Sequence, residues 1–125
     1  MSIVIAGVGL RRDCPADEIV ALVRRAAASA GREVSALAAP SFKEAETGLR
    51  EAAAELGVAV LLVTEADLAA AQAGCLTRSA VAERAVGVAS VAEGSALAAA
   101  GSGARLLLAR IAGPSATCAL AEGPG

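Results

Sequence analysis

The sequence predicts an α/β fold, a three-layer α/β/α sandwich with a mixed, mainly parallel sheet of about five strands. Short β-branched runs alternate with helical segments along the first part of the chain. Such alternation builds a parallel sheet through right-handed crossovers. Two extended runs near the C-terminus are separated only by a short turn, so they must pair as an antiparallel hairpin. Together the two patterns predict the mixed sheet.

The first predicted unit is a buried strand over residues 2–8, followed by a helix. The strand is rich in β-branched residues, and Gly7-Val8-Gly9 ends it. Pro15 suits the first turn of a helix, and Gly31 suits its end. The glycines fail the dinucleotide-binding pattern G-x-G-x-x-G/A because Arg12 stands at the third small position. A tight turn between strand and helix is the better interpretation.

Two further strand–helix units follow. Residues 34–39 are predicted to form a strand, and residues 44–56 the helix after it. Residues 58–63 form a continuous apolar run and are the clearest candidate for a fully buried strand. Thr64 and Asp67 resemble a capping box, with aspartate in place of glutamate, at the start of a short helix.

The last third of the chain begins with an ambiguous stretch. Residues 74–83 are predicted to be irregular, and residues 86–88 to form a short extended piece. Ser90 and Glu93 have the spacing of a capping box, in which each side chain accepts from the main chain of the other residue. A helix is therefore predicted from this point to the glycines near residue 101.

The C-terminal hairpin completes the predicted domain. Its strands are residues 105–111 and 116–121, and residues 122–125 are predicted to be a frayed tail. A chain of 125 residues suits one domain, predicted here to cover residues 1–121.

Composition excludes several classes of protein. The net charge is −2, and Phe42 is the only aromatic residue, so the chain lacks the basic stripe and stacking residues of a nucleic-acid-binding protein. No apolar run is long enough for a membrane span or a signal peptide. The three cysteines, at positions 14, 75 and 118, are far apart, and histidine is absent. We therefore expect a cytoplasmic protein with free thiols, no metal and no cofactor.

Basic residues follow several of the predicted strands. Arg11 and Arg12 come after the first strand, Lys43 after the second, and Arg110 near the end of the penultimate one. Loops after parallel strands meet at one edge of a sheet, where ligands of open α/β folds bind. The helix that starts at Ser90 could add main-chain amides for an anion. These residues predict a crevice for a small polyanion.

Each candidate also has a structural interpretation. Arg11 and Arg12 fit a solvated loop, and Glu46 fits a surface pair with Lys43. Glu93 fits the capping box, although Glu46 or Glu93 could serve in acid–base catalysis if burial raised its pKa. Cys14 lies beside a helix start, but without a histidine partner we expect it to be unreactive.

Read in order, these loops resemble the CobE family and the C-terminal domain of CbiG, proteins of cobalamin (vitamin B12) biosynthesis. The stretches that carry the resemblance are Gly7–Arg12 with Ala16–Ile19, Lys43–Leu49, Val86–Leu97, and Arg110 with Thr117–Ala121. The family often has cysteine where Leu10 stands and lysine where Arg110 stands. The first difference argues against an essential thiol there, and the second preserves the charge.

The resemblance implies binding of a corrin or precorrin intermediate, whose acetate and propionate arms suit the predicted anion crevice. The candidate ligand contacts are Gly9, Arg11, Arg12, Lys43, Glu46, Ser90, Glu93, Arg110 and Thr117. CbiG-type proteins, which match only through their C-terminal part, are associated with opening a precorrin lactone and releasing acetaldehyde. Three roles therefore stay open: a binder, carrier or accessory factor, which we favour, a lactone hydrolase, and a non-catalytic partner of another pathway enzyme.

Overall fold

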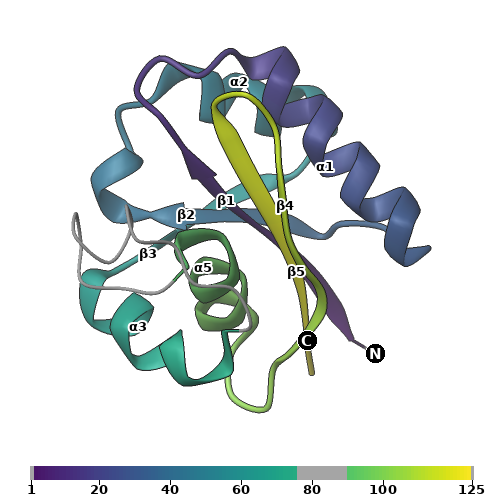
Figure 1. Ribbon diagram of the computed structural model, residues 1–125, viewed down its shortest axis with the longest axis vertical. Coiled ribbons are helices and arrows are strands. Elements are labelled where there is room, and N and C mark those ends of the chain that lie inside the picture. Colours follow the sequence, from purple (N-terminus) through teal and green to yellow (C-terminus); the bar gives the residue numbers. More distant parts are fainter. Residues whose placement is uncertain (1, 76–89, 125) are drawn as a thin grey trace.

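The computed structural model describes residues 2–75 and 90–124, and it confirms the predicted fold class (Figure 1). A five-stranded mixed sheet lies between two layers of helices. The elements in chain order, with η1 and η2 as short 3-10 helices, are β1 (Ile3–Leu10), α1 (Ala16–Ala30), β2 (Ala36–Pro40), η1 (Ser41–Lys43), α2 (Thr47–Leu56), β3 (Ala59–Val63), α3 (Glu65–Ala70), η2 (Ala71–Gly74), α5 (Val91–Ala100), β4 (Arg105–Ala112) and β5 (Ala116–Gly123).

The strand order is β3-β2-β1-β5-β4. β1 pairs in parallel with β2, and β2 with β3, whereas β5 is antiparallel to both β1 and β4. Strands β1 to β4 therefore run in the same direction, and their C-terminal ends lie at one edge of the sheet. We call this the carboxyl edge. Every loop that leaves it is a candidate part of a ligand site.

The two faces of the sheet bury separate clusters of small aliphatic side chains. Helices α1 and α2 cover one face, and α3, η2 and α5 cover the other (Figure 1). Helix α5 packs directly on the main chain of β1, because a Cβ atom at Gly7 would overlap Ala92 and Ala96. A sheet with glycine and alanine at the contact lets the helix approach closely, and so a core without aromatic residues can still be dense.

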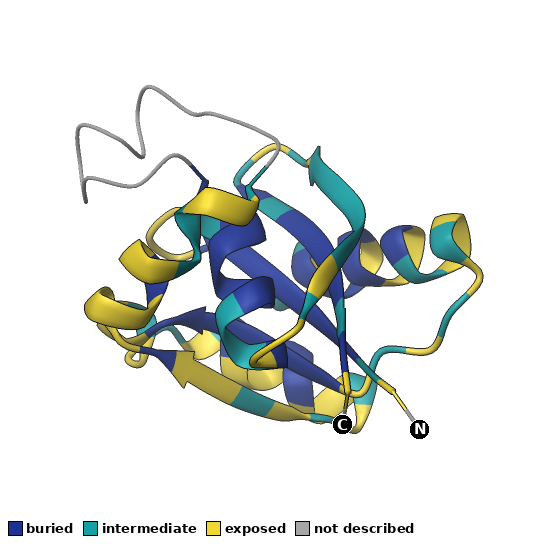
Figure 2. Ribbon diagram, turned by 90° about the horizontal axis from the view of Figure 1, so that it is seen from below, coloured by how far each residue is buried: buried dark blue, intermediate teal, exposed yellow. Residues whose placement is uncertain are grey.

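The apolar strand β3 is present, but the prediction that it is fully buried is wrong. Among the described residues, β3 is an edge strand whose single pairing partner is β2, and Leu61 and Leu62 are 37% and 39% exposed. Figure 2 shows β3 as mostly exposed beside the buried strands β1 and β2. An apolar run indicates a strand, but it cannot distinguish the centre of a sheet from its edge.

Other boundaries differ by a few residues. Helix α2 begins at Thr47 rather than at residue 44, because the chain first forms η1 and a turn. β5 continues through Glu122 and Gly123, which were expected to fray, because Glu122 forms ion pairs with Arg32 and Arg105. The predictions for residues 76–83 and 86–88 lie outside the described residues. Within the described ranges, no helix is long and apolar enough to cross a membrane.

Candidate functional site

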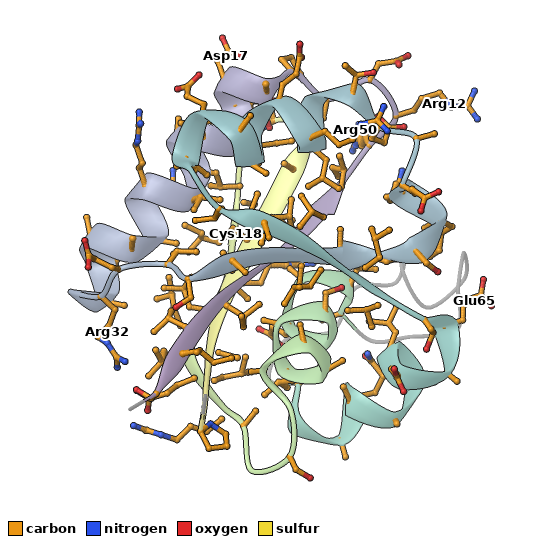
Figure 3. All side chains as sticks on the ribbon, turned by 180° about the vertical axis from the view of Figure 1, so that it is seen from behind. Arg12, Asp17, Arg32, Arg50, Glu65 and Cys118 are labelled. Atoms are coloured by element: carbon orange, nitrogen blue, oxygen red, sulfur yellow. The ribbon has the colours of Figure 1, made fainter. Side chains whose placement is uncertain are left out.

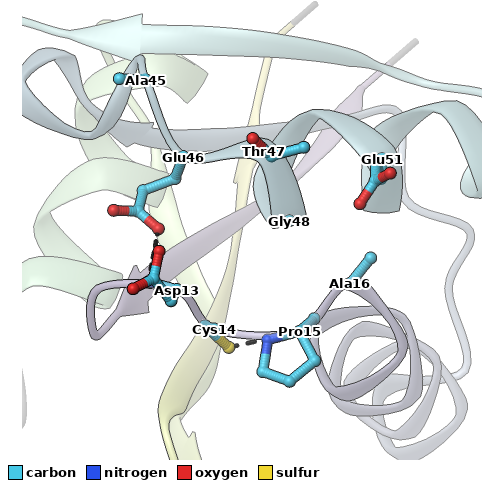
Figure 4. Close-up of a pocket in the computed structure, with 9 residues that line it drawn as sticks. All are labelled: Asp13, Cys14, Pro15, Ala16, Ala45, Glu46, Thr47, Gly48 and Glu51. Atoms are coloured by element: carbon cyan, nitrogen blue, oxygen red, sulfur yellow. Dashed lines mark hydrogen bonds between the residues drawn. The ribbon is translucent and has the colours of Figure 1, made fainter.

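The loop after β1 is a tight turn that carries two arginines. The N–H of Cys14 donates to the carbonyl of Arg11 at 3.2 Å, which closes the turn over residues 11–14. Asp13 has a φ of 61°, in the left-handed region that non-glycine residues rarely occupy. Its N–H donates to Oε1 of Glu46 at 2.8 Å (Figure 4). The Glu46 side chain therefore joins the loop after β2 to the loop after β1.

The same turn is joined to the β4–β5 hairpin. The N–H of Arg11 donates to the carbonyl of Ser115 at 2.9 Å. Glu18, in the first turn of α1, accepts from the hydroxyl of Ser115 at 2.6 Å and from its N–H at 2.7 Å. These two hydrogen bonds lower the pKa of Glu18. Three loops at the carboxyl edge are thus connected by hydrogen bonds.

Cys14 is the last residue of this turn, and its side chain is buried. Desolvation is the largest cause that raises the pKa of its thiol, and the carboxylates of Glu18, Glu46 and Asp17 raise it further; only the Ser115 hydroxyl, 3.4 Å from the sulfur, acts to lower it. This environment supports the expectation of an unreactive thiol.

On the other face, α5 begins at Ser90 with half of the predicted capping box. The Ser90 hydroxyl accepts from the N–H of Glu93 at 3.2 Å. The reciprocal bond is not formed as predicted, since the N–H of Ser90 donates to Oε1 of Gln72 at 3.0 Å. The Glu93 side chain instead reaches β4, where its Oε2 accepts from the N–H of Arg110 at 2.9 Å. A residue distant in sequence thus replaces the local partner.

Arg110 lies in an irregular part of β4. The register shifts between the pairs Leu108–Leu120 and Ile111–Cys118, so that two residues of β4, Ala109 and Arg110, oppose one residue of β5. A bulge of this kind changes the direction of the side chains in the bulged strand. The Glu93 carboxylate, which is fully buried, binds the main chain at this bulge.

Gly9 and Thr117 are neighbours at the carboxyl edge, near the start of α5. They are register partners in β1 and β5, and a Cβ atom at Gly9 would lie 2.6 Å from the Thr117 hydroxyl and 3.6 Å from Val91. A side chain at position 9 would therefore force the Thr117 hydroxyl to move. Gly9, Thr117, Ser90, Glu93 and Arg110 form one cluster around the N-terminal end of α5.

An open pocket of about 270 Å³ lies between the N-terminal ends of α1 and α2 (Figure 4). Its charged lining residues are Asp13, Glu46 and Glu51, and no arginine or lysine lines it. This pocket is therefore unsuitable for a polyanion. Within the described ranges, no three acidic or cysteine side chains are grouped closely enough to hold a metal ion.

The basic side chains in the described part of the chain fall into two sets. One set contacts a carboxylate or carbonyl oxygen: Arg24, Arg25, Arg32 and Arg105. The other set has no side-chain hydrogen bond or ion pair within residues 2–75 and 90–124: Arg11, Arg12, Lys43, Arg50 and Arg110. Every member of the second set lies on a segment at or next to the carboxyl edge. Figure 3 shows Arg12 and Arg50 at the same end of the molecule, far from Arg32.

The structure thus separates the predicted site residues into two groups. One group is the cluster around α5. Arg11, Arg12, Lys43 and Glu46 lie instead on the loops after β1 and β2, which the Asp13–Glu46 bond joins. Lys43 and Glu46 form no ion pair with each other in the described structure, so the surface-pair interpretation is wrong.

Two residues that hold segments together at this edge are not singled out by the sequence. They are Gln72, which binds the main chain of Ser90, and Ser115, which binds Glu18. Arg50, at the start of α2, is a further basic residue near this edge that the sequence does not single out. Thr64 does cap α3 as predicted, since its hydroxyl accepts from the N–H of Asp67 at 3.1 Å.

Comparison with known proteins identifies related sequences and structures. Residues 4–121 match the family described as cobalamin synthesis G C-terminus. The solved structure of CobE, a protein from the cobalamin (vitamin B12) biosynthetic pathway, is 41% identical, with a TM-score of 0.91 over 97% of this chain and 90% of that chain. The cobalamin biosynthesis protein chiG from Agrobacterium tumefaciens str. C58 is 35% identical, with a TM-score of 0.81 over 98% of this chain and 100% of that chain.

A longer protein contains the same fold. A cobalamin biosynthesis protein G homolog from Sulfolobus solfataricus is 25% identical, with a TM-score of 0.73 over 96% of this chain and 36% of that chain. No curated protein sequence matches the chain.

Proposed function

The chain belongs to the cobalamin synthesis G C-terminus family and is a protein of cobalamin biosynthesis, and we propose that it binds a polycarboxylated corrin or precorrin intermediate. Its role would be that of a cytoplasmic binder, carrier or accessory factor. One observation carries the proposal: in the described structure, the basic side chains without a partner are those on segments at or next to the carboxyl edge. Unpaired cations on several linked loops suit a ligand with several carboxylates.

The expected contacts are Arg11, Arg12, Lys43 and Arg110. Arg11 and Arg12 are exposed on the turn after β1, and Lys43 and Arg110 are partly exposed on η1 and β4. Carboxylate arms would bind these side chains and avoid the neighbouring pocket, which is lined by Asp13, Glu46 and Glu51.

Binding is favoured over catalysis because both candidate acid–base residues contact the main chain of another segment. Glu46 accepts from the N–H of Asp13, and Glu93 accepts from the N–H of Arg110. Each carboxylate therefore has a main-chain contact that explains its position without a catalytic role. A lactone hydrolase would have to use the same residues as proton donor or acceptor as well.

A visible-absorption titration with hydrogenobyrinic acid tests the proposal. We expect a saturable spectral change for the wild-type protein. Arg11→Ala and Lys43→Ala should each weaken binding about three- to tenfold, because each removes a charge-assisted contact. Added salt should weaken binding further. Arg24→Ala is the matched control, because Arg24 pairs with Glu55 on the helical face away from these loops.

Several results would contradict the proposal. A protein that gives no spectral change, and that retains no pigment on gel filtration, is not a binder of this ligand class. Equal weakening by Arg24→Ala and Arg11→Ala would show that net charge, and not the carboxyl edge, determines binding. Release of acetaldehyde by the purified protein would favour the hydrolase, and co-purification with a pathway enzyme in the absence of pigment affinity would favour a docking role.

A further inference from the structure

The first observation concerns Glu46 and the turn that carries Arg11 and Arg12. Among the described residues, Asp13 is the only non-glycine residue with positive φ, a conformation that is unfavourable for an L-residue because its Cβ atom crowds the following carbonyl oxygen. The Glu46 carboxylate accepts the N–H of this residue at 2.8 Å. It therefore stabilises the unusual main-chain conformation that follows the two arginines directly.

The second observation concerns Glu93 and the bulge that carries Arg110. Glu93 is fully buried, and its Oε2 lies 2.9 Å from the main-chain nitrogen of Arg110. Residues at a bulge lose the regular ladder pattern, so their main-chain groups need other partners. The carboxylate supplies such a partner and thereby fixes the part of β4 from which the Arg110 side chain projects.

The two carboxylates share a feature that simple electrostatics does not explain. Each lies next to a cation that we propose as a contact for an anionic ligand, and an acidic group that is ionised there should weaken the binding of an anion. In both cases the carboxylate binds the main chain of the cation-bearing segment and not its guanidinium group. The cationic side chains consequently stay free of ion pairs in the described structure.

We infer that Glu46 and Glu93 are positioning residues, one for the Arg11–Arg12 turn and one for Arg110. Each fixes the main chain of an arginine-bearing segment, so that the arginines meet the carboxylate arms of the ligand in a preorganised geometry. The inference rests on the proposed function. It assigns the two acidic residues to ligand recognition through the arginines, and not to proton transfer.

Removing an acidic side chain distinguishes the two effects. Binding of the anionic ligand should weaken if the side chain positions the arginines, and it should tighten if the side chain only repels the ligand. In the titration with hydrogenobyrinic acid, Glu46→Ala should weaken binding about three- to tenfold. Glu44→Ala is the matched control, because Glu44 is exposed on the same loop and the described structure gives its side chain no partner. It should leave binding unchanged or slightly stronger. Glu46→Gln, which keeps an acceptor oxygen, should retain most of the affinity.

The corresponding test for Glu93 is a double-mutant cycle. Glu93→Ala should weaken binding in the wild-type background and have no further effect in an Arg110→Ala background, because it acts through Arg110. If Glu93→Ala does not fold, the same cycle with Glu46→Ala and Arg12→Ala tests the inference at the exposed site. Equal losses in both backgrounds, or tighter binding by Glu46→Ala, would overturn the inference.

Amide hydrogen exchange, followed by NMR without ligand, tests the main-chain role of Glu46 independently of ligand binding. Glu46→Ala should accelerate exchange at the amide of Asp13 about tenfold or more and leave Arg110 unchanged. Unchanged exchange at Asp13 would overturn the inference even if the wild-type protein binds pigment. Accelerated exchange, in a protein whose wild type binds no pigment, would overturn the proposed function and not the main-chain role of Glu46.

Discussion

The Glu18 carboxylate joins the first turn of α1 to the β4–β5 hairpin through two hydrogen bonds from Ser115. These bonds lower its pKa from the ordinary value of 4.5. A carboxyl group with a lowered folded-state pKa contributes stability above its unfolded-state pKa, and the contribution is lost as the pH falls through the folded-state pKa. We therefore expect Glu18→Gln to lower the melting temperature at pH 7, with a difference from wild type that shrinks below about pH 4.

Asp17→Asn is the control for this prediction. It removes the same charge from the same helical turn, but Asp17 is exposed and does not contact Ser115. Its melting temperature should follow that of the wild type more closely at every pH. A Glu18→Gln difference that stays constant from pH 7 to pH 3 would exclude the Ser115 hydrogen bonds as its cause.

The burial of two of the three thiols predicts which cysteine reacts with a thiol reagent. Burial raises the pKa of Cys14 above its ordinary value and that of Cys118 to about 12, so neither is a thiolate at pH 8. We expect a thiol reagent such as DTNB to modify only Cys75 rapidly in the native protein, because Cys75 is partly exposed. Cys75→Ser should abolish the fast phase, and unfolding should expose the remaining thiols. A fast phase that persists in Cys75→Ser would contradict the assignment.

The sequence indicates which residues are candidates for the site better than it indicates their hydrogen-bond partners. Glu46 and Glu93 are recognisable as candidates because they follow a strand and open a helix. Their partners, Asp13 and Arg110, are 33 and 17 residues away in the chain. The capping-box pattern at Ser90 predicts a local partner for Glu93, and only the packing of α5 against β4 provides the competing donor.

At the scale of the elements, the close approach of α5 to β1 is the feature most sensitive to mutation. A Cβ atom at Gly7 would overlap the main chain of α5 at Ala92 and Ala96. Gly7→Ala should therefore force α5 away from the sheet and lower the free energy of unfolding by about 1–3 kcal/mol. Urea unfolding measures this loss.

Gly74→Ala is the control for the helix contact. Among the described residues, the added methyl group would meet just the end of the Leu97 side chain, which can move. It should therefore change the free energy of unfolding by less than about 1 kcal/mol. Equal losses for the two variants would show that α5 does not rest on the main chain of β1.

Local patterns determine where elements lie in the chain, but they do not determine every boundary. The period of the apolar residues and the cap at Gly31 predict α1 closely. Helix α2 starts later than predicted because the main chain of residues 44–46 forms a turn that brings Glu46 to Asp13. That contact is tertiary, so no helical propensity within the segment indicates it.

At the scale of the whole molecule, charge is sorted between the two ends of the sheet. At the carboxyl edge, the described cations have no ionic partners, whereas Glu122 near the opposite edge binds both Arg32 and Arg105. The sequence predicts which basic residues follow strands, because that depends on element order alone. It does not predict which arginines form ion pairs. Arg32 and Arg105 both pair with Glu122, which lies in another element of the chain.

The inner strand β2 and the edge strand β3 also differ in burial, and this difference can be measured. Leu37 lies in β2 and is fully buried, whereas Leu61 in the neighbouring strand β3 is 37% exposed. Leu37→Ala should leave a cavity between β2 and the helices and cost about 2–5 kcal/mol of unfolding free energy. Leu61→Ala should cost about 1 kcal/mol or less, because water fills the space at an edge strand. Similar losses for the two variants would mean that β3 is covered in solution, contrary to its position at the edge of the five-stranded sheet.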